Sequence, residues 1–223
     1  MSDHAAIAFL HGLGTGPSAW EPQRRAFLAS RPVLTPRVTA DLETVAPELD
    51  AFAVRNGAID LVGLSLGGLA ALRYAASHDT VRRLVVCAGF VSLPPDAARK
   101  VSRVARGLRF LPGPVVRRGL TADVPEPYDE VARRELHGVS GRDVSQAMRV
   151  AATADLSAEV ARIQVPTLVL CGARDEPNLP LSRALAEALP AGSFREVPNA
   201  GHVANLDAPD AFTAALREFL DGQ

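Results

Sequence analysis

The sequence predicts an α/β fold built on a doubly wound, mostly parallel sheet of about six strands, with helices on its faces. Two observations support this fold class. Short apolar runs rich in β-branched residues alternate with helical patterns along most of the chain, as expected for parallel strands joined by crossover helices. One long stretch, residues 91–155, breaks the alternation and is expected to form a helical lid insertion.

Composition limits the class of protein. The chain has 223 residues, of which 48% are apolar and 22% charged, and its formal net charge is −1. This is enough apolar material for one sizeable core, and the near-zero charge gives no electrostatic reason to expect a nucleic-acid partner. The N-terminus shows no signal-peptide pattern and no apolar stretch reaches about 18 residues, so we expect no membrane span and a cytoplasmic location.

The predicted strands are apolar runs bounded by glycine, aspartate or proline, and the second and the last are the weakest. In chain order they are residues 5–10, 32–38, 59–62, 84–88, 167–171 and 194–197. Cys87 and Cys171 lie at the ends of two such runs, where a buried, reduced thiol is the expected state. We therefore predict no disulfide.

The predicted helices lie between these runs and after the last one. They are residues 22–30, 47–56, 65–77, 181–189 and 208–220. Because helices between consecutive parallel strands must cross a face of the sheet, this order predicts helices on both faces.

Residues 91–155 contain proline-rich breaks, short helical pieces such as residues 97–108, and no convincing strand. We therefore expect a core formed by residues 1–90 and 156–223 and a helical lid formed by residues 91–155. Seven cations and no acid occupy residues 97–118: Arg99, Lys100, Arg103, Arg106, Arg109, Arg117 and Arg118. This cluster either attracts an anionic substrate or surface, or it forms a solvated helix face in an arginine-rich protein.

The stretch LVGLSLGGLA, residues 61–70, places Ser65 between Gly63 and Gly67, where a predicted strand meets a predicted helix. A sharp turn at that point exposes a serine hydroxyl at the sheet edge, and it crowds the positions two residues before and after the serine. The helix that follows supplies an outward N–H from Leu66 and the positive end of its dipole. The turn fits a nucleophile, although a tightly packed strand–helix turn would have the same glycines.

A glycine-rich turn, HGLGTG, follows the first predicted strand. If it lies beside the Leu66 amide, the Leu13 N–H is a second donor for a developing oxyanion, and each such donor contributes on the order of 3 kcal/mol. A nucleotide-binding loop is the alternative. No P-loop lysine follows, and the glycine spacing of a dinucleotide turn is incomplete, so we discount nucleotides.

Two further side chains complete a candidate catalytic group. Asp175 follows the strand at residues 167–171, at the same sheet edge as Ser65, although carboxylates also commonly cap turns. His202 lies in a loop before the last helix, and it is the best-placed base among the five histidines. The order Ser65, Asp175, His202 is the order found on doubly wound sheets that carry a nucleophilic serine.

Taken together, HGLGTG (11–16), GLSLGG (63–68), PTLVLCGARD (166–175) and NAGHVANLDAP (199–209) resemble the α/β-hydrolase superfamily, in its lid-bearing esterase and lactonase-like branch. The resemblance runs from residue 9 to residue 219. It implies a triad of Ser65, His202 and Asp175, with the Leu13 and Leu66 amides as the oxyanion hole. Many members have two more strands before the HG turn than this chain has, so we expect a sheet trimmed at its N-terminal edge.

The resemblance implies a serine hydrolase that cleaves a small or medium carboxylic ester, thioester or lactone through an acyl-enzyme on Ser65, with no metal or organic cofactor. Carbon–carbon hydrolase or lyase chemistry on the same triad is an alternative, as is a non-catalytic small-ligand sensor with a retained pocket. Trp20 and Phe90 are candidates to line the substrate pocket, with core packing as the other reading. We expect a small-molecule substrate and a monomer or homodimer.

Overall fold

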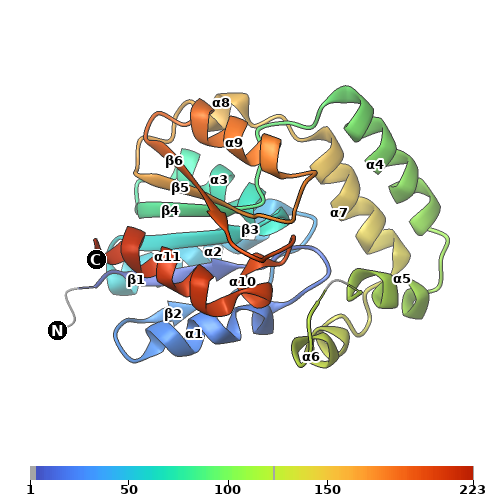
Figure 1. Cartoon of the computed structure of the whole chain (residues 1–223), viewed down its shortest axis with the longest axis horizontal. Coiled ribbons are helices and arrows are strands. Elements are labelled where there is room, and N and C mark those ends of the chain that lie inside the picture. Colours follow the sequence, from blue (N-terminus) through green and yellow to red (C-terminus); the bar gives the residue numbers. More distant parts are fainter. Residues whose placement is uncertain (1–3, 123, 223) are drawn as a thin grey trace.

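The computed structural model describes residues 4–122 and 124–222, so the first three residues and the last residue of the predicted core lie outside it. Its centre is one six-stranded parallel sheet in the order β2-β1-β3-β4-β5-β6 (Figure 1). The strands are β1 (Ala6–Leu10), β2 (Val33–Leu34), β3 (Ile59–Leu64), β4 (Val81–Cys87), β5 (Thr167–Gly172) and β6 (Gly192–Val197). The predicted α/β class, with a parallel sheet of six strands, is confirmed.

The central strands are apolar along their whole length because both faces of the sheet are covered. Along β1, Ile7 and Phe9 belong to one buried cluster, whereas Ala8 and Leu10 belong to the other. Successive side chains of a strand point to opposite faces, so a strand between two helical layers must be apolar at every position.

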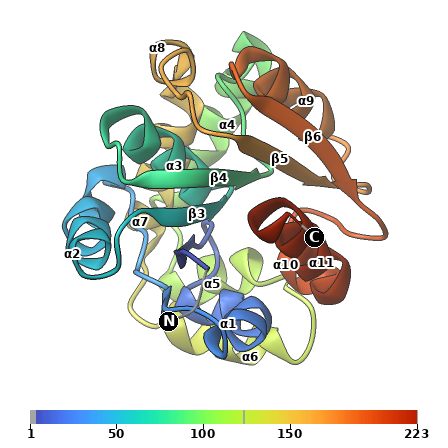
Figure 2. The same cartoon turned by 90° about the vertical axis from the view of Figure 1, so that its left-hand side faces the viewer.

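The helices that cover the sheet form two groups. One face carries α1 (Glu21–Leu28), α10 (Ala204–Asp207) and α11 (Pro209–Asp221), and the other carries α2 (Ala46–Asn56), α3 (Leu66–Ser77), α8 (Ser157–Val160) and α9 (Leu179–Ala188). Figure 2 shows the two groups on opposite sides of the strands. Two short 3₁₀ helices, η1 (Pro17–Trp20) and η2 (Leu42–Val45), precede α1 and α2. None of the helices in the described residues has the length and apolar composition needed to cross a bilayer.

The edge strand β2 has only two residues, Val33 and Leu34, whereas the sequence predicted a strand over residues 32–38. Pro36 follows closely, and proline has no N–H to donate to a neighbouring strand. No described strand lies outside β2, which agrees with the trimmed edge expected from the sequence. The residues after β2 therefore form a loop at the C-terminal edge of the sheet.

Besides α8, four helices lie in the connection between β4 and β5: α4 (Pro95–Leu108), α5 (Gly113–Leu120), α6 (Tyr128–Glu135) and α7 (Gly141–Thr153). Figure 1 shows them beyond one end of the sheet. The two ends of this segment meet, because Ser92 pairs with Asp155 in an antiparallel bridge and the Leu156 N–H donates to the Val91 carbonyl at 2.9 Å. The segment thus leaves the core and returns to it at one point.

The strand order also marks where a ligand is expected. The chain passes from β1 to β2 on one side and then to β3 on the other, so the direction of winding reverses between β1 and β3. In open parallel sheets, ligands bind outside the carboxyl ends of the strands at this switch point. The HG turn follows β1 and Ser65 follows β3, so both lie there.

Candidate active site

Ser65 occupies a strained turn between β3 and α3. Its backbone has φ 53° and ψ −114°, a region that residues with side chains adopt rarely and at a cost of about 1–3 kcal/mol. The turn is fixed on both sides: the Ser65 N–H donates to the Cys87 carbonyl at 2.8 Å, and the Leu69 N–H donates to the Ser65 carbonyl at 3.1 Å. Such strain persists only where the surrounding structure enforces it, and it is common at active sites.

The flanking glycines have the steric role that the sequence predicts. A Cβ atom on Gly67 would overlap the carbonyl oxygens of Leu10 and His11, and one on Gly63 would overlap the carbonyl oxygen of Gly67. The turn packs directly against the end of β1. Neither position can hold a side chain without a shift of the backbone.

The HG turn lies beside the serine. A Cβ atom on Gly12 would be 3.3 Å from the Leu64 carbonyl oxygen and 3.4 Å from the Ser65 Cβ, so Leu13 follows a residue in contact with the serine. Leu66 is the first residue of α3, and the first N–H groups of a helix have no acceptor within the helix. The two amides predicted to form an oxyanion hole thus belong to adjoining segments.

His11 links the HG turn to the loop after β2. It is buried, and its Nε2 accepts a hydrogen bond from the Val38 N–H at 3.0 Å, so the proton of the neutral ring is on Nδ1, which lies 2.9 Å from the Gly12 carbonyl oxygen. Burial is the main cause that lowers the pKa of His11, and the nearby Arg37 lowers it further. His11 is therefore a neutral structural link.

Asp175 and His202 come together as the sequence predicts. Asp175 follows β5 and is 6% exposed, whereas His202 lies after β6, and His202 Nδ1 is 2.8 Å from Asp175 Oδ2. The Nδ2 of Asn178 donates to the other carboxylate oxygen at 2.8 Å. Burial raises the pKa of Asp175, but hydrogen bonds from His202 and Asn178 outweigh this effect and leave the pKa below its usual value. Asp175 is thus held as a carboxylate.

A close backbone approach brings His202 to this carboxylate. A Cβ atom on Gly172, the last residue of β5, would overlap the carbonyl oxygens of Gly201 and Ala200. The Arg174 N–H donates to the Ala200 carbonyl at 2.8 Å, and the Gly201 N–H donates to the Asp207 carboxylate at 2.7 Å. The loop before α10 is therefore anchored to the turn that carries Asp175.

Ser65 and His202 are not joined by a hydrogen bond among the described residues, although both follow strands at the same edge of the sheet. Ser65 is half-buried, and the His202 side chain is 40% exposed. Hydrogen bonds between a nucleophile and its base often tighten only in the complex with substrate. The imidazole of His202 and the carboxylate of Asp175 are thus in direct contact, and Ser65 lies at the same edge of the sheet.

A cavity of about 340 Å³ opens beside these elements. It is lined by residues 11–15, residues 37–41, Leu66 and six residues of the β4–β5 connection: Leu136, Val139, Asp143, Val144, Gln146 and Ala147. Both predicted oxyanion donors, Leu13 and Leu66, are among its lining residues. Cavities of this size and mixed lining suit small or medium ligands.

Two residues that the sequence suggested as lining the substrate pocket, Trp20 and Phe90, lie in the core. Trp20 is fully buried, and its ring stacks on Phe9 at 5.0 Å between centroids. Phe90 is 7% exposed and belongs to the cluster on the other face of the sheet. Neither lines the 340 Å³ cavity, and both have the packing role that the sequence offered as the other reading.

The helices of the β4–β5 connection contact the HG turn itself. The Glu135 carboxylate, at the end of α6, accepts hydrogen bonds from the Ser18 hydroxyl at 2.5 Å and the Ser18 N–H at 3.2 Å. A Cβ atom on Gly14 would be 3.0 Å from the Leu120 carbonyl oxygen at the end of α5. Sequence reasoning missed Glu135 and Asn178, because neither belongs to a recognisable motif.

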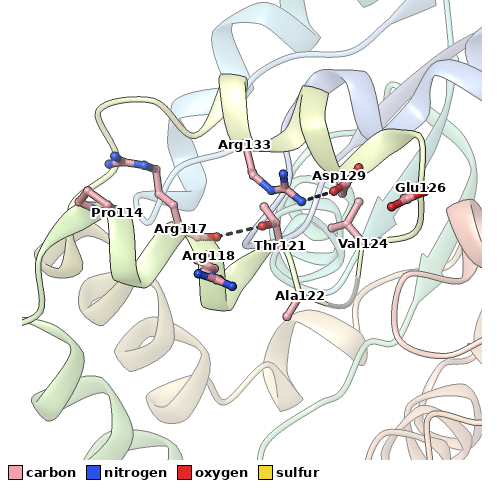
Figure 3. Close-up of a pocket in the computed structure, with 9 residues that line it drawn as sticks. All are labelled: Pro114, Arg117, Arg118, Thr121, Ala122, Val124, Glu126, Asp129 and Arg133. Carbon is pink, nitrogen blue, oxygen red and sulfur yellow. Dashed lines mark hydrogen bonds and ion pairs between the residues drawn. The ribbon is translucent and has the colours of Figure 1, made fainter.

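A second hollow, of about 760 Å³, lies within the same connection. Figure 3 shows Arg117 and Arg118 of α5 and Arg133 of α6 around it, with Arg133 paired to Asp129. None of the predicted catalytic or oxyanion residues lines this hollow.

Comparison with known proteins identifies the family of the chain. Residues 7–215 match the model of the alpha/beta hydrolase family. The match spans most of the chain, and the chain belongs to this family. Membership of this family, together with its hydrolase and esterase relatives, identifies the chain as an enzyme of the serine hydrolase type.

Individual relatives are more distant. The chain is 29% identical to a putative carbamate hydrolase from Caulobacter sp. (strain K31), over 100% of this chain and 92% of that protein. It is 27% identical to a pimeloyl-[acyl-carrier protein] methyl ester esterase from Neisseria meningitidis, over 83% of this chain and 75% of that protein. A thermophilic esterase from Thermogutta terrifontis has the same fold, with a TM-score of 0.80 at 23% identity over 100% of this chain and 91% of that chain.

Proposed function

We propose that this enzyme cleaves a small or medium carboxylic ester, thioester or lactone through an acyl-enzyme on Ser65. The observation that carries the proposal is the 2.8 Å contact between His202 Nδ1 and the buried Asp175, at the sheet edge where Ser65 has a strained backbone. A base held by a carboxylate, at the same sheet edge as a serine hydroxyl, is the arrangement that serine acyl transfer requires.

The steps follow from the chemistry of these groups. Neutral His202 accepts the Ser65 proton as Oγ attacks the acyl carbonyl, and Asp175 holds the imidazole orientation and stabilises the imidazolium. The Leu13 and Leu66 N–H groups donate to the developing oxyanion. The bond from the acyl carbon to the leaving oxygen, or to sulfur in a thioester, then breaks, and the leaving alcohol or thiol takes the proton from His202. Water repeats the sequence and releases the acid.

The β4–β5 connection is proposed as the lid of this site, with residues 91–155 as the insertion. Its contribution of Leu136, Val139 and residues of α7 to the 340 Å³ cavity supports this role. The mostly aliphatic side chains there favour an apolar acyl group. The esterase from Neisseria meningitidis, a relative that acts on a methyl ester, supports the ester class.

Hydrolysis of p-nitrophenyl acetate and butyrate tests the proposal. We expect turnover by the wild-type enzyme and a loss of about 10⁴-fold or more in kcat in Ser65→Ala and in His202→Ala. Ser77→Ala and His137→Ala are matched controls, because both residues are exposed and lie outside the site.

Retention of turnover in Ser65→Ala would contradict the proposal. So would a wild-type protein that binds small ligands but hydrolyses no ester, thioester or lactone of an acyl-chain series. The first result removes Ser65 as the nucleophile, and the second favours a sensor or a lyase.

A further inference from the structure

The segment formed by α4, α5 and the short turn between them carries a cluster of positive charge that the proposed chemistry does not use. The cluster consists of the seven cations of residues 97–118, with no acid among them, in a chain whose formal net charge is −1. Of these seven cations, only Arg99 has an ion-pair partner among the described residues, and that partner is Asp96. Within residues 4–122 and 124–222, the other six cations have no carboxylate within ion-pair distance.

The same segment of α4, the turn and α5 also carries exposed apolar side chains. Four of the seven large hydrophobic side chains that are exposed in the described chain lie there: Val104 (47%), Phe110 (76%), Leu111 (43%) and Val115 (55%). The guanidinium of Arg109 lies 5.0 Å from the centroid of the Phe110 ring. Contiguous exposed apolar side chains on a folded protein usually mark an interaction surface.

The packing of α4 directs these groups outward. Ala105 is fully buried and α4 packs against α7, whereas Arg99, Arg103 and Arg106 are exposed at helical spacing along the opposite face. Phe110 and Leu111 follow the end of this helix. Figure 1 shows the α4–α5 corner on the outer side of the connecting helices, away from the sheet.

We propose that this corner, residues 99–118, docks on an anionic lipid surface. Apolar side chains at a protruding corner can enter the boundary between headgroups and acyl chains, while surrounding cations remain at the headgroups. A run of four to eight cations beside apolar side chains is typical of binding to anionic lipid. The surface that fits this corner therefore has a layer of negatively charged headgroups over an apolar interior.

A folded acidic protein fits these observations less well. The centres of protein interfaces are depleted of charged residues and are built around pockets. Here the cations are dense and of one sign, and Phe110, Leu111 and Val104 line neither the 340 Å³ cavity nor the 760 Å³ hollow. A fluid surface needs no pocket to receive them.

Vesicle co-sedimentation of the full-length protein tests the proposal. We expect binding to phosphatidylcholine vesicles that contain about 30 mol% phosphatidylglycerol, weaker binding as salt rises, and little binding to phosphatidylcholine alone. Arg103→Gln with Arg106→Gln should weaken the partition coefficient by about 25-fold, because each cation near such a surface contributes about fivefold. Phe110→Ser should weaken it at unchanged charge.

Matched controls come from α2, where Val54 is 87% exposed and Arg55 is its exposed neighbour. Val54→Ser and Arg55→Gln should leave vesicle binding unchanged, and unchanged thermal unfolding would show that all variants are folded. Because none of these residues lies in the proposed catalytic group, the result does not depend on ester hydrolysis.

Three results would overturn the proposal. These are no binding to anionic vesicles, binding that is equal on neutral vesicles, and binding that survives both the Arg103/Arg106 and the Phe110 variants. Concentration-dependent dimerisation that is lost in Phe110→Ser, without vesicle binding, would assign the corner to self-association. Binding to an acidic protein without binding to vesicles would likewise overturn the proposal, because it would assign the corner to a protein partner.

Discussion

At the scale of single residues, burial and hydrogen bonds together decide the charge states of His11 and Asp175. His11 and Asp175 are both buried, yet their surroundings favour opposite charge states. The His11 ring accepts from the Val38 N–H, which requires a neutral nitrogen, and burial lowers its pKa. Asp175 receives donors from His202 and Asn178, which outweigh the effect of burial on its pKa. One residue is held neutral, and the other is held as a carboxylate.

The state of His11 predicts how stability depends on pH. Its pKa in the folded protein lies below the ordinary value of 6.5, so at pH values between the two the unfolded chain binds more protons. The free energy of unfolding should therefore fall as the pH drops below 6.5, by at most about 1.4 kcal/mol per pH unit from this residue. Urea unfolding of the wild type and of His11→Asn between pH 5 and pH 8 measures the effect.

The difference in stability between the two proteins should be constant above neutral pH and should shrink in acid. The exposed His137, changed to Asn, is the matched control and should leave the pH dependence as in the wild type. A difference between wild type and His11→Asn that stays constant down to pH 5 would contradict the neutral assignment.

At the scale of elements, the β3–α3 turn shows how local sequence and sheet packing together fix the serine. The left-handed backbone at Ser65 requires α3 to begin against the end of β1, and only glycine at position 67 leaves room for that approach. The same contact places the first N–H groups of α3 beside the HG turn. Strain at one residue is thus maintained by packing between three elements.

Alanine substitutions at two helical glycines separate this packing from helix propensity. Gly67→Ala should lower the free energy of unfolding by about 2–4 kcal/mol, because its Cβ would overlap backbone atoms of β1 and the HG turn. Gly107→Ala in α4 meets nothing within 4 Å and should raise stability by about 0.5–1 kcal/mol. Chemical unfolding measures both, and a neutral effect of Gly67→Ala would show that the turn does not need the close approach.

At the scale of the whole molecule, the helices of the β4–β5 connection and the core meet at the HG turn. Glu135 is 117 residues away from Ser18 in the chain, yet its carboxylate receives both the hydroxyl and the N–H of that serine. Leu120 contacts Gly14 in the same turn. The position of the connecting helices therefore affects the segment that carries Leu13.

This contact predicts a positioning effect on turnover. Glu135→Ala should lower kcat on p-nitrophenyl butyrate by about tenfold with a smaller change in KM, because the proposed Leu13 donor would lose its alignment with the oxyanion. Glu130→Ala is the matched control, since Glu130 lies on the same helix and its ion pair in the described part of the chain is with the exposed Arg134. Equal effects of the two substitutions, or a change confined to KM, would contradict the positioning role.

The sequence predicted those parts of the molecule that depend on local patterns. The strands covered on both faces were found because every position along them is apolar, and Asp175 and His202 were found because each follows a predicted strand within a motif. The edge strand was predicted too long, because Pro36 ends a pairing that apolarity alone would continue. Glu135 was missed because its contact with Ser18 depends on how distant segments pack, and Asn178 was missed because its hydrogen bond to Asp175 depends on the local shape of the turn after β5.

The site of covalent labelling tests the central claim, that Ser65 is the nucleophile, most directly. Treatment with a fluorophosphonate followed by peptide mapping should show one adduct, on Ser65, which forms much more slowly in His202→Ala and is absent in Ser65→Ala. An adduct on any other residue of the wild-type protein, or no adduct on a folded wild-type protein, would contradict the account.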